Sequence, residues 1–103
     1  MRLKLGAKIN GVQPEMLWCM MIIEPILDEY NQELILTSIT DGEHSSKSRH
    51  YIGYAIDIRT WQLKQDQKTG ECATRMQDAL GKEFYVHVED THIHIQFNGL
   101  PRR

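Results

Sequence analysis

Histidine and glutamate side chains are concentrated in one short stretch near the end of the chain. Residues 84–97 contain His87, Glu89, His92 and His94. Imidazole nitrogens and carboxylate oxygens are standard zinc ligands, and both groups also transfer protons near neutral pH. The stretch therefore indicates either a site of metal or acid–base chemistry or an exposed polar surface that happens to be rich in histidine.

The same stretch predicts an antiparallel hairpin. Residues 84–89 and 92–97 each alternate apolar and polar side chains, and only Asp90-Thr91 separates them, which is typical of two strands joined by a tight turn. If Glu89 pairs with His92, alternate side chains fall on opposite faces. One face would then carry Tyr85, His87, Glu89, His92, His94 and Gln96. The other would carry Phe84, Val86, Val88, Ile93, Ile95 and Phe97, and we expect it to face the core.

A second group of polar residues precedes the hairpin. Residues 48–57 read Ser-Arg-His-Tyr-Ile-Gly-Tyr-Ala-Ile-Asp, so His50 and Asp57 add two more potential zinc ligands. Asp57 lies within the alternating apolar pattern of residues 53–59, which predicts a strand. A buried lone carboxylate is costly, so Asp57 needs a partner. That partner is either a metal ion or an arginine, for which the candidates are Arg49, Arg59 and Arg75.

The remaining elements must support these two groups. Apolar residues at three- and four-residue steps predict a helix from about Pro14 to Asn31, which Pro25 should kink or divide. Further expectations are a strand or extended arm at 1–10, a strand at 33–40, a loop at 41–49, an irregular segment at 63–70 and a helix at 73–80 that Gly81 ends. The predicted fold is α+β: a mostly antiparallel sheet with two or three helices on one face. The polar groups would lie on the other face, in a groove lined by Tyr51, Trp61, Tyr85 and Gln96, although Trp61 would equally suit a place capping the core.

Composition restricts the remaining possibilities. The 103 residues fit one domain, 1–103, and the net charge of −2 predicts binding neither to nucleic acid nor to a membrane. Cys19 and Cys72 form no CxxC pair, so we expect no disulfide scaffold, and Cys19 should be a small core residue. Residues 1–10 lack the apolar run of a secretory signal. We expect a monomer.

Together the two groups resemble a known family. Ser48 to Asp57 matches the motif SxHxxGxAxD, and Glu89 followed by His92-Ile93-His94 matches a later acid-and-HxH motif. Both motifs resemble those of the zinc D-Ala-D-Ala metallopeptidase superfamily. Its members include D,D-carboxypeptidases, D,D-dipeptidases, phage L-alanyl-D-glutamate endolysins and the hedgehog signalling domain. The similarity covers about residues 14–97, and the motifs are specific as an ordered set rather than singly.

The resemblance implies a role for each matching residue. One Zn²⁺ per chain would be held by His50, Asp57 and His94, with Glu89 as general base. His92 and His44 would be polar groups beside the metal that stabilise the transition state. Some members space the acid and the third ligand as ExxH, which would make His92 the ligand instead of His94. His87 has no clear counterpart in the family; it would either contact substrate or simply fill the polar face.

The resemblance also implies a substrate class. Carboxypeptidases and dipeptidases of this family use an upstream arginine to hold the substrate's terminal carboxylate, and this chain has no arginine between Leu3 and Arg49. That difference favours an endopeptidase acting within the peptidoglycan stem peptide, with L-Ala-D-Glu as one candidate bond, over a D,D-carboxypeptidase. We expect an endolysin or virion-associated lysin of phage type, made in the cytoplasm without a signal peptide and acting on the cell wall after release.

Two other interpretations remain. The chain could be a non-catalytic zinc-binding interaction module, or a structural phage protein with a weakened site. Glu89 distinguishes them from an enzyme, because a purely structural zinc site has no use for a general base. If His92 and His94 both bound the metal together with His50 and Asp57, four protein ligands would close the site, as in structural zinc centres.

Overall fold

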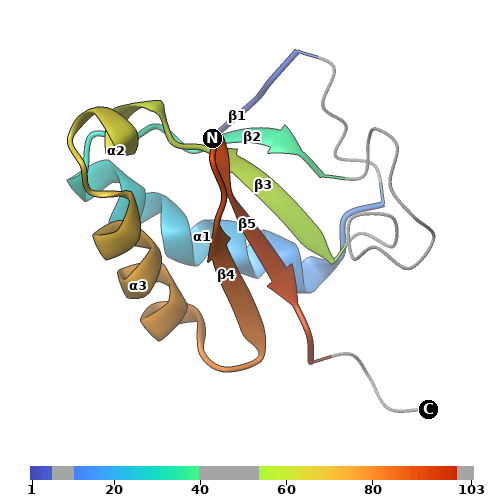
Figure 1. Cartoon of the computed structure of the whole chain (residues 1–103). Coiled ribbons are helices and arrows are strands. Elements are labelled where there is room, and N and C mark those ends of the chain that lie inside the picture. The colour runs from blue at the N-terminus through green and yellow to red at the C-terminus, as the bar shows by residue number, and fades with distance from the viewer. Residues whose placement is uncertain (6–10, 40–53, 100–103) are drawn as a thin grey trace.

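The computed structural model describes residues 1–5, 11–39 and 54–99, and these form one mixed sheet with helices packed against it (Figure 1). The described elements, in chain order, are β1 (Arg2–Leu3), α1 (Pro14–Glu29), β2 (Ile35–Ser38), β3 (Ala55–Arg59), α2 (Trp61–Gln65), α3 (Thr69–Leu80), β4 (Phe84–Val88) and β5 (His92–Phe97). The predicted α+β class is confirmed at this level.

The strands lie in the order β1-β2-β3-β5-β4. The short strand β1 runs parallel to β2, whereas β2–β3, β3–β5 and β5–β4 are antiparallel pairs. The sheet is therefore mostly antiparallel, as its alternating sequence pattern predicts. Strand β5, which carries His92 and His94, lies between β3 and β4, so its polar side chains have neighbours on both sides.

The core lies between the helices and one face of the sheet. Helix α1 crosses behind the strands and α3 lies beside it, towards β4 (Figure 1). The predicted apolar stripe of α1 is confirmed, since Met16, Met20, Ile23 and Leu27 are all buried, as is Cys19. They pack with alternate residues of the central strands, including Ile56, Ile58, Ile93 and Ile95. None of the described helices is long and apolar enough to cross a membrane.

Helix α1 is continuous through Pro25, so of the two expected effects, a kink or a division, the division is wrong. Proline removes the hydrogen bond to the carbonyl four residues earlier, that of Met21. Both Pro25 and Met21 lie on the exposed side of α1. Water can bind the freed carbonyl there, which makes the proline tolerable.

Residues 63–70, expected to be irregular, contain most of α2 and the start of α3. The stabilising group comes from a distant part of the sequence. The buried side chain of Gln32 accepts hydrogen bonds through Oε1 from the backbone N–H of Gln62 at 2.9 Å and of Leu63 at 3.3 Å. These are first-turn groups that a helix leaves unpaired. Local sequence contains no sign of this cap.

Val88 does not belong to the core, contrary to the expectation for that face of the hairpin. It is 42% exposed, and Val86 is only half-buried. Strand β4 is an edge strand, and α3 covers its beginning. There Gln77 donates from Nε2 to the carbonyl of Phe84 at 2.8 Å and accepts through Oε1 from the N–H of Val86 at 3.0 Å. The side chain of Gln77 thus replaces a missing neighbouring strand at this part of the edge.

Candidate functional site

The hairpin has the register that its alternation predicts. His87 lies opposite His94 and Tyr85 opposite Gln96, and the backbone N–H of Glu89 donates to the carbonyl of His92 at 2.8 Å. Strand β3 pairs with the other edge of β5 and places Asp57 opposite His94 and Arg59 opposite His92. The polar face therefore holds three rows: Tyr85–Gln96–Ala55, His87–His94–Asp57 and Glu89–His92–Arg59.

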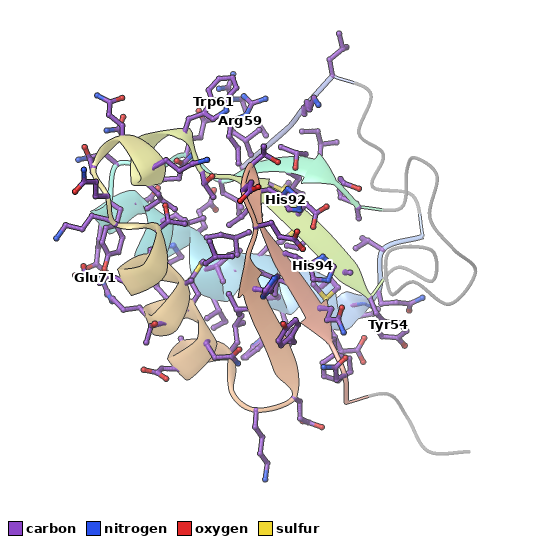
Figure 2. All side chains as sticks on the ribbon, in the orientation of Figure 1. Tyr54, Arg59, Trp61, Glu71, His92 and His94 are labelled. Carbon is purple, nitrogen blue, oxygen red and sulfur yellow. The ribbon has the colours of Figure 1, made fainter. Side chains whose placement is uncertain are left out.

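Asp57 is the centre of a small hydrogen-bonded cluster. Its Oδ1 lies 2.9 Å from Nδ1 of His94, and its Oδ2 lies 3.7 Å from Nε2 of His92. The side chains of Asp57 and His94 are only 13% and 18% exposed. Figure 2 shows His92 and His94 on the same face of the sheet, side by side along β5. His94 is 37 positions from Asp57 in the sequence. Both histidines are neighbours of Asp57 because strands β3 and β5 pair.

Two of the three arginine partners considered for Asp57 are engaged elsewhere. Arg75 forms an ion pair with Glu29 at 2.9 Å. The guanidinium of Arg59 stacks on the ring of Trp61, 3.8 Å from its centroid. Arg49 lies outside the described residues. Within the described part of the chain, histidines are the partners that the geometry gives to the carboxylate.

The imidazole of His94 is bound at both nitrogens. Nδ1 faces Asp57, and Nε2 lies 2.7 Å from Oε1 of Gln96, whose Nε2 in turn donates to Oδ1 of Asn98 at 2.8 Å. Two oxygen acceptors suit an imidazolium that donates from both nitrogens. The hydrogen bond to Asp57 accordingly raises the pKa of His94 above 6.5, against the effect of burial, and Gln96 and the charge of Glu89 raise it further.

Glu89 lies at the end of the hairpin, exposed and beside His92. The turn that follows is held in place, because Nζ of Lys64 on α2 donates to the carbonyl of Asp90. Oγ1 of Thr91 lies 3.0 Å from Nδ1 of His92 and so orients that ring. The carboxylate of Glu89 is therefore solvent-accessible on the rim of the polar face.

His87 has a partner of its own. Its Nδ1 lies 3.1 Å from the hydroxyl of Tyr85, and the two rings stack with their centroids 5.6 Å apart. Both side chains are exposed. This arrangement agrees with a surface or contact role for His87 rather than with a ligand position.

Of the three expected metal ligands, the structure describes Asp57 and His94. His50, His44 and Tyr51 lie outside the described residues. Among residues 1–5, 11–39 and 54–99, no three His, Cys, Asp or Glu side chains form a group that could hold a metal ion. His94 and His92 approach different oxygens of Asp57, so their nitrogens do not converge.

The Asp57–His94 pair nevertheless fits two positions of a zinc site. Donors about 2.0–2.1 Å from a tetrahedral zinc ion lie about 3.3 Å from each other, and the observed separation is 2.9 Å. If the imidazole proton of His94 stays on Nε2 and is donated to Gln96, the unprotonated Nδ1 is the nitrogen that faces Asp57. A second hydrogen bond of this kind is what usually fixes the tautomer of a metal-binding histidine.

A cleft lies beside this cluster. The cleft has a volume of about 340 Å³. Its lining residues are Lys4, Thr37, Arg59, Trp61, Thr91 and His92. Trp61 lines this cleft and is 68% exposed, so it does not cap the core. The cleft is not the expected groove, because Tyr85 and Gln96 are not among its described lining residues and Tyr51 lies outside the described part of the chain. Lys4, Thr37 and Arg59 were not singled out for the site, although alternation along β3 puts Arg59 on the same face as Asp57.

Comparisons of the chain with protein-family models, with characterised proteins and with solved structures find no match.

Proposed function

We propose that this chain is a zinc-dependent endopeptidase that hydrolyses an amide bond in the peptidoglycan stem peptide. The observation that carries the proposal is the partly buried Asp57–His94 pair, directly opposed across β3 and β5 and flanked by His92 and Glu89 on the same face. Motifs that are more than thirty residues apart in the sequence supply the members of this group. The family resemblance of the two motifs adds the substrate class.

Asp57 and His94 would hold the metal together with His50. Their donor atoms, a carboxylate oxygen and an imidazole nitrogen, are ones that zinc accepts, and three protein ligands are usual where catalysis needs an open position. When bound, zinc supplies a Lewis acid that polarises an amide carbonyl and makes water a better nucleophile near neutral pH. Gln96 keeps His94 oriented by accepting its second N–H.

Glu89 and His92 would handle protons and charge. The exposed carboxylate of Glu89 can take a proton from the attacking water and deliver it to the leaving amine. His92, oriented by Thr91 at 3.0 Å and held near Asp57, can donate a hydrogen bond to the oxyanion that forms as the amide carbon becomes tetrahedral. His44 is proposed for the same task.

The test is the release of new amino groups from purified peptidoglycan of several chemotypes. We expect release by the zinc-loaded wild type and none after chelation, with recovery when zinc is returned. Glu89→Gln should lower the rate about 10²- to 10⁴-fold, the usual contribution of a general base, while one zinc per chain is retained. Glu83→Gln, which removes another exposed carboxylate near the start of β4, is the matched control and should keep full activity.

A second candidate is a non-catalytic zinc-binding module. It is favoured by the closeness of both His92 and His94 to the Asp57 carboxylate. If the His92 ring turned so that its nitrogen converged with that of His94, the two histidines together with Asp57 and His50 would make a closed four-ligand site. In that case wild type would bind zinc but release no amines from any chemotype. His92→Gln would then weaken zinc binding as strongly as His94→Gln does, whereas the endopeptidase proposal expects His94→Gln to be much the more damaging to zinc binding.

A further inference from the structure

The cleft beside His92 is positively charged. Its described lining residues include two cations, Lys4 and Arg59, and no carboxylate. Two hydroxyl groups, of Thr37 and Thr91, and the imidazole of His92 complete its polar wall. Lys4 follows β1 and Arg59 ends β3, so the sheet brings together charges that are 55 positions apart. A pocket of this composition favours an anion.

The carboxylates that the structure describes do not neutralise these two cations. Glu33 instead binds Arg2 at 2.6 Å, and Asp57 binds the histidines of β5. Within the described residues, neither Lys4 nor Arg59 takes part in an ion pair. Their charges are therefore available to a ligand.

Arg59 is held in position before any ligand arrives. Its guanidinium lies 3.8 Å from the centroid of the Trp61 ring, and stacking on one face leaves the N–H groups at the edge free for a bidentate acceptor. Trp61 begins α2, whose first turn is fixed by Gln32. The exposed ring of Trp61 thus supports the charged side chain of Arg59.

We propose that this cleft is a carboxylate-binding subsite in which Arg59 and Lys4 hold an internal carboxylate of the peptide substrate. The nature of that substrate rests on the proposed function, and the α-carboxylate of a γ-linked D-glutamyl residue is the chemistry we assign. A planar carboxylate matches the fork of Arg59, with Lys4 as a second point charge. Because His92 lines the cleft and also flanks Asp57, a carboxylate bound there places the neighbouring amide beside the Asp57–His94 pair.

Two peptides test the subsite. Both are N-acetyl-L-Ala-γ-D-Glu-L-Lys-amide, one with the free α-carboxylate and the other with a carboxamide in its place. Binding to isotope-labelled protein is followed by NMR, with and without zinc. The carboxylate peptide should bind about tenfold more tightly, the ordinary effect of one charge-assisted bidentate contact, and should shift the amide signals of β3 and the β4–β5 turn.

Variants of the protein show which residues cause the preference for the carboxylate peptide over the carboxamide peptide. Arg59→Gln should abolish it and Lys4→Gln should reduce it about threefold. Lys82→Gln, which removes an exposed charge in the turn before β4, should leave it unchanged. Equal binding of the two peptides, or a preference that survives Arg59→Gln, overturns the subsite. Competition by inorganic phosphate at the same affinity as the carboxylate peptide overturns its assignment to a carboxylate.

The outcome is separable from that of the proposed function. If the carboxylate is preferred and neither peptide is cleaved, the subsite stands and the peptidase proposal fails. If both peptides are cleaved with equal kcat/KM, the peptidase proposal stands and the subsite fails.

Discussion

The substitution Asp57→Asn tests the electrostatics of the cluster without any zinc present. The hydrogen bond that His94 donates to the Asp57 carboxylate raises the pKa of His94 above 6.5. A raised pKa means that the contribution to stability is fully present below about pH 6.5, the unfolded value, and is lost as the pH rises through the folded value. The metal-free Asp57→Asn variant should therefore be destabilised strongly at pH 6 and much less at pH 9.

The size of the effect follows from the burial of the pair. Hydrogen bonds to charged groups contribute about 1.5–3 kcal/mol, and side chains that are 13% and 18% exposed are little screened by water. For a domain of about 100 residues, each kcal/mol corresponds to about 4–8 °C in Tm, so we expect a loss of about 6–24 °C at pH 6. The measurement is thermal and urea unfolding followed by circular dichroism in the presence of a chelator.

Asp78→Asn is the matched control, because Asp78 is an exposed carboxylate on α3, and it should leave Tm within about 3 °C of wild type. An equal loss at both pH values for Asp57→Asn, or a larger one at pH 9, would refute the assignment of an imidazolium–carboxylate pair.

Three further predictions concern the metal and the core. Zinc binding measured by calorimetry should tighten about tenfold per pH unit below the pKa of His94, since the metal must displace a proton there; a pH-independent affinity between pH 5 and 7 would exclude His94 as a ligand. Gln32→Ala should lower the free energy of unfolding by about 1–2 kcal/mol, because it leaves two backbone N–H groups at the start of α2 unpaired; Gln65→Ala, an exposed site on α2, serves as control in the same urea titration. Burial raises the pKa of Cys19 to about 12 and that of Cys72 to about 11, so both thiols should react with a disulfide reagent at pH 8 only as fast as the protein unfolds; rapid labelling of the native protein would contradict their burial.

Most of the secondary structure could be predicted from short-range patterns in the sequence. Alternation over residues 84–97 predicted both strands and their register, because a side-chain period of two leaves only one register that puts the isoleucines inside and the histidines outside. The end of α3 at Gly81 was equally visible, since φ there is 90°, a value that glycine adopts without strain. The core stripe of α1 followed from helical periodicity alone.

Features that depend on distant partners could not be predicted in this way. Helix α2 exists where its own residues suggested an irregular segment, because Gln32 caps it from thirty positions away. Val88 is exposed, although the pattern indicated a core position, because α3 covers only the beginning of β4.

For the candidate site, the sequence by itself determined which residues can bind metal or transfer protons and on which face of the hairpin they lie. Only the tertiary structure decided that Asp57 faces His94 and not Arg59 or Arg75, and that Lys4 and Arg59 share a cleft with His92. The physical reason is that alternation specifies the face of a strand, whereas the pairing of strands that are far apart in the chain specifies the neighbours across it.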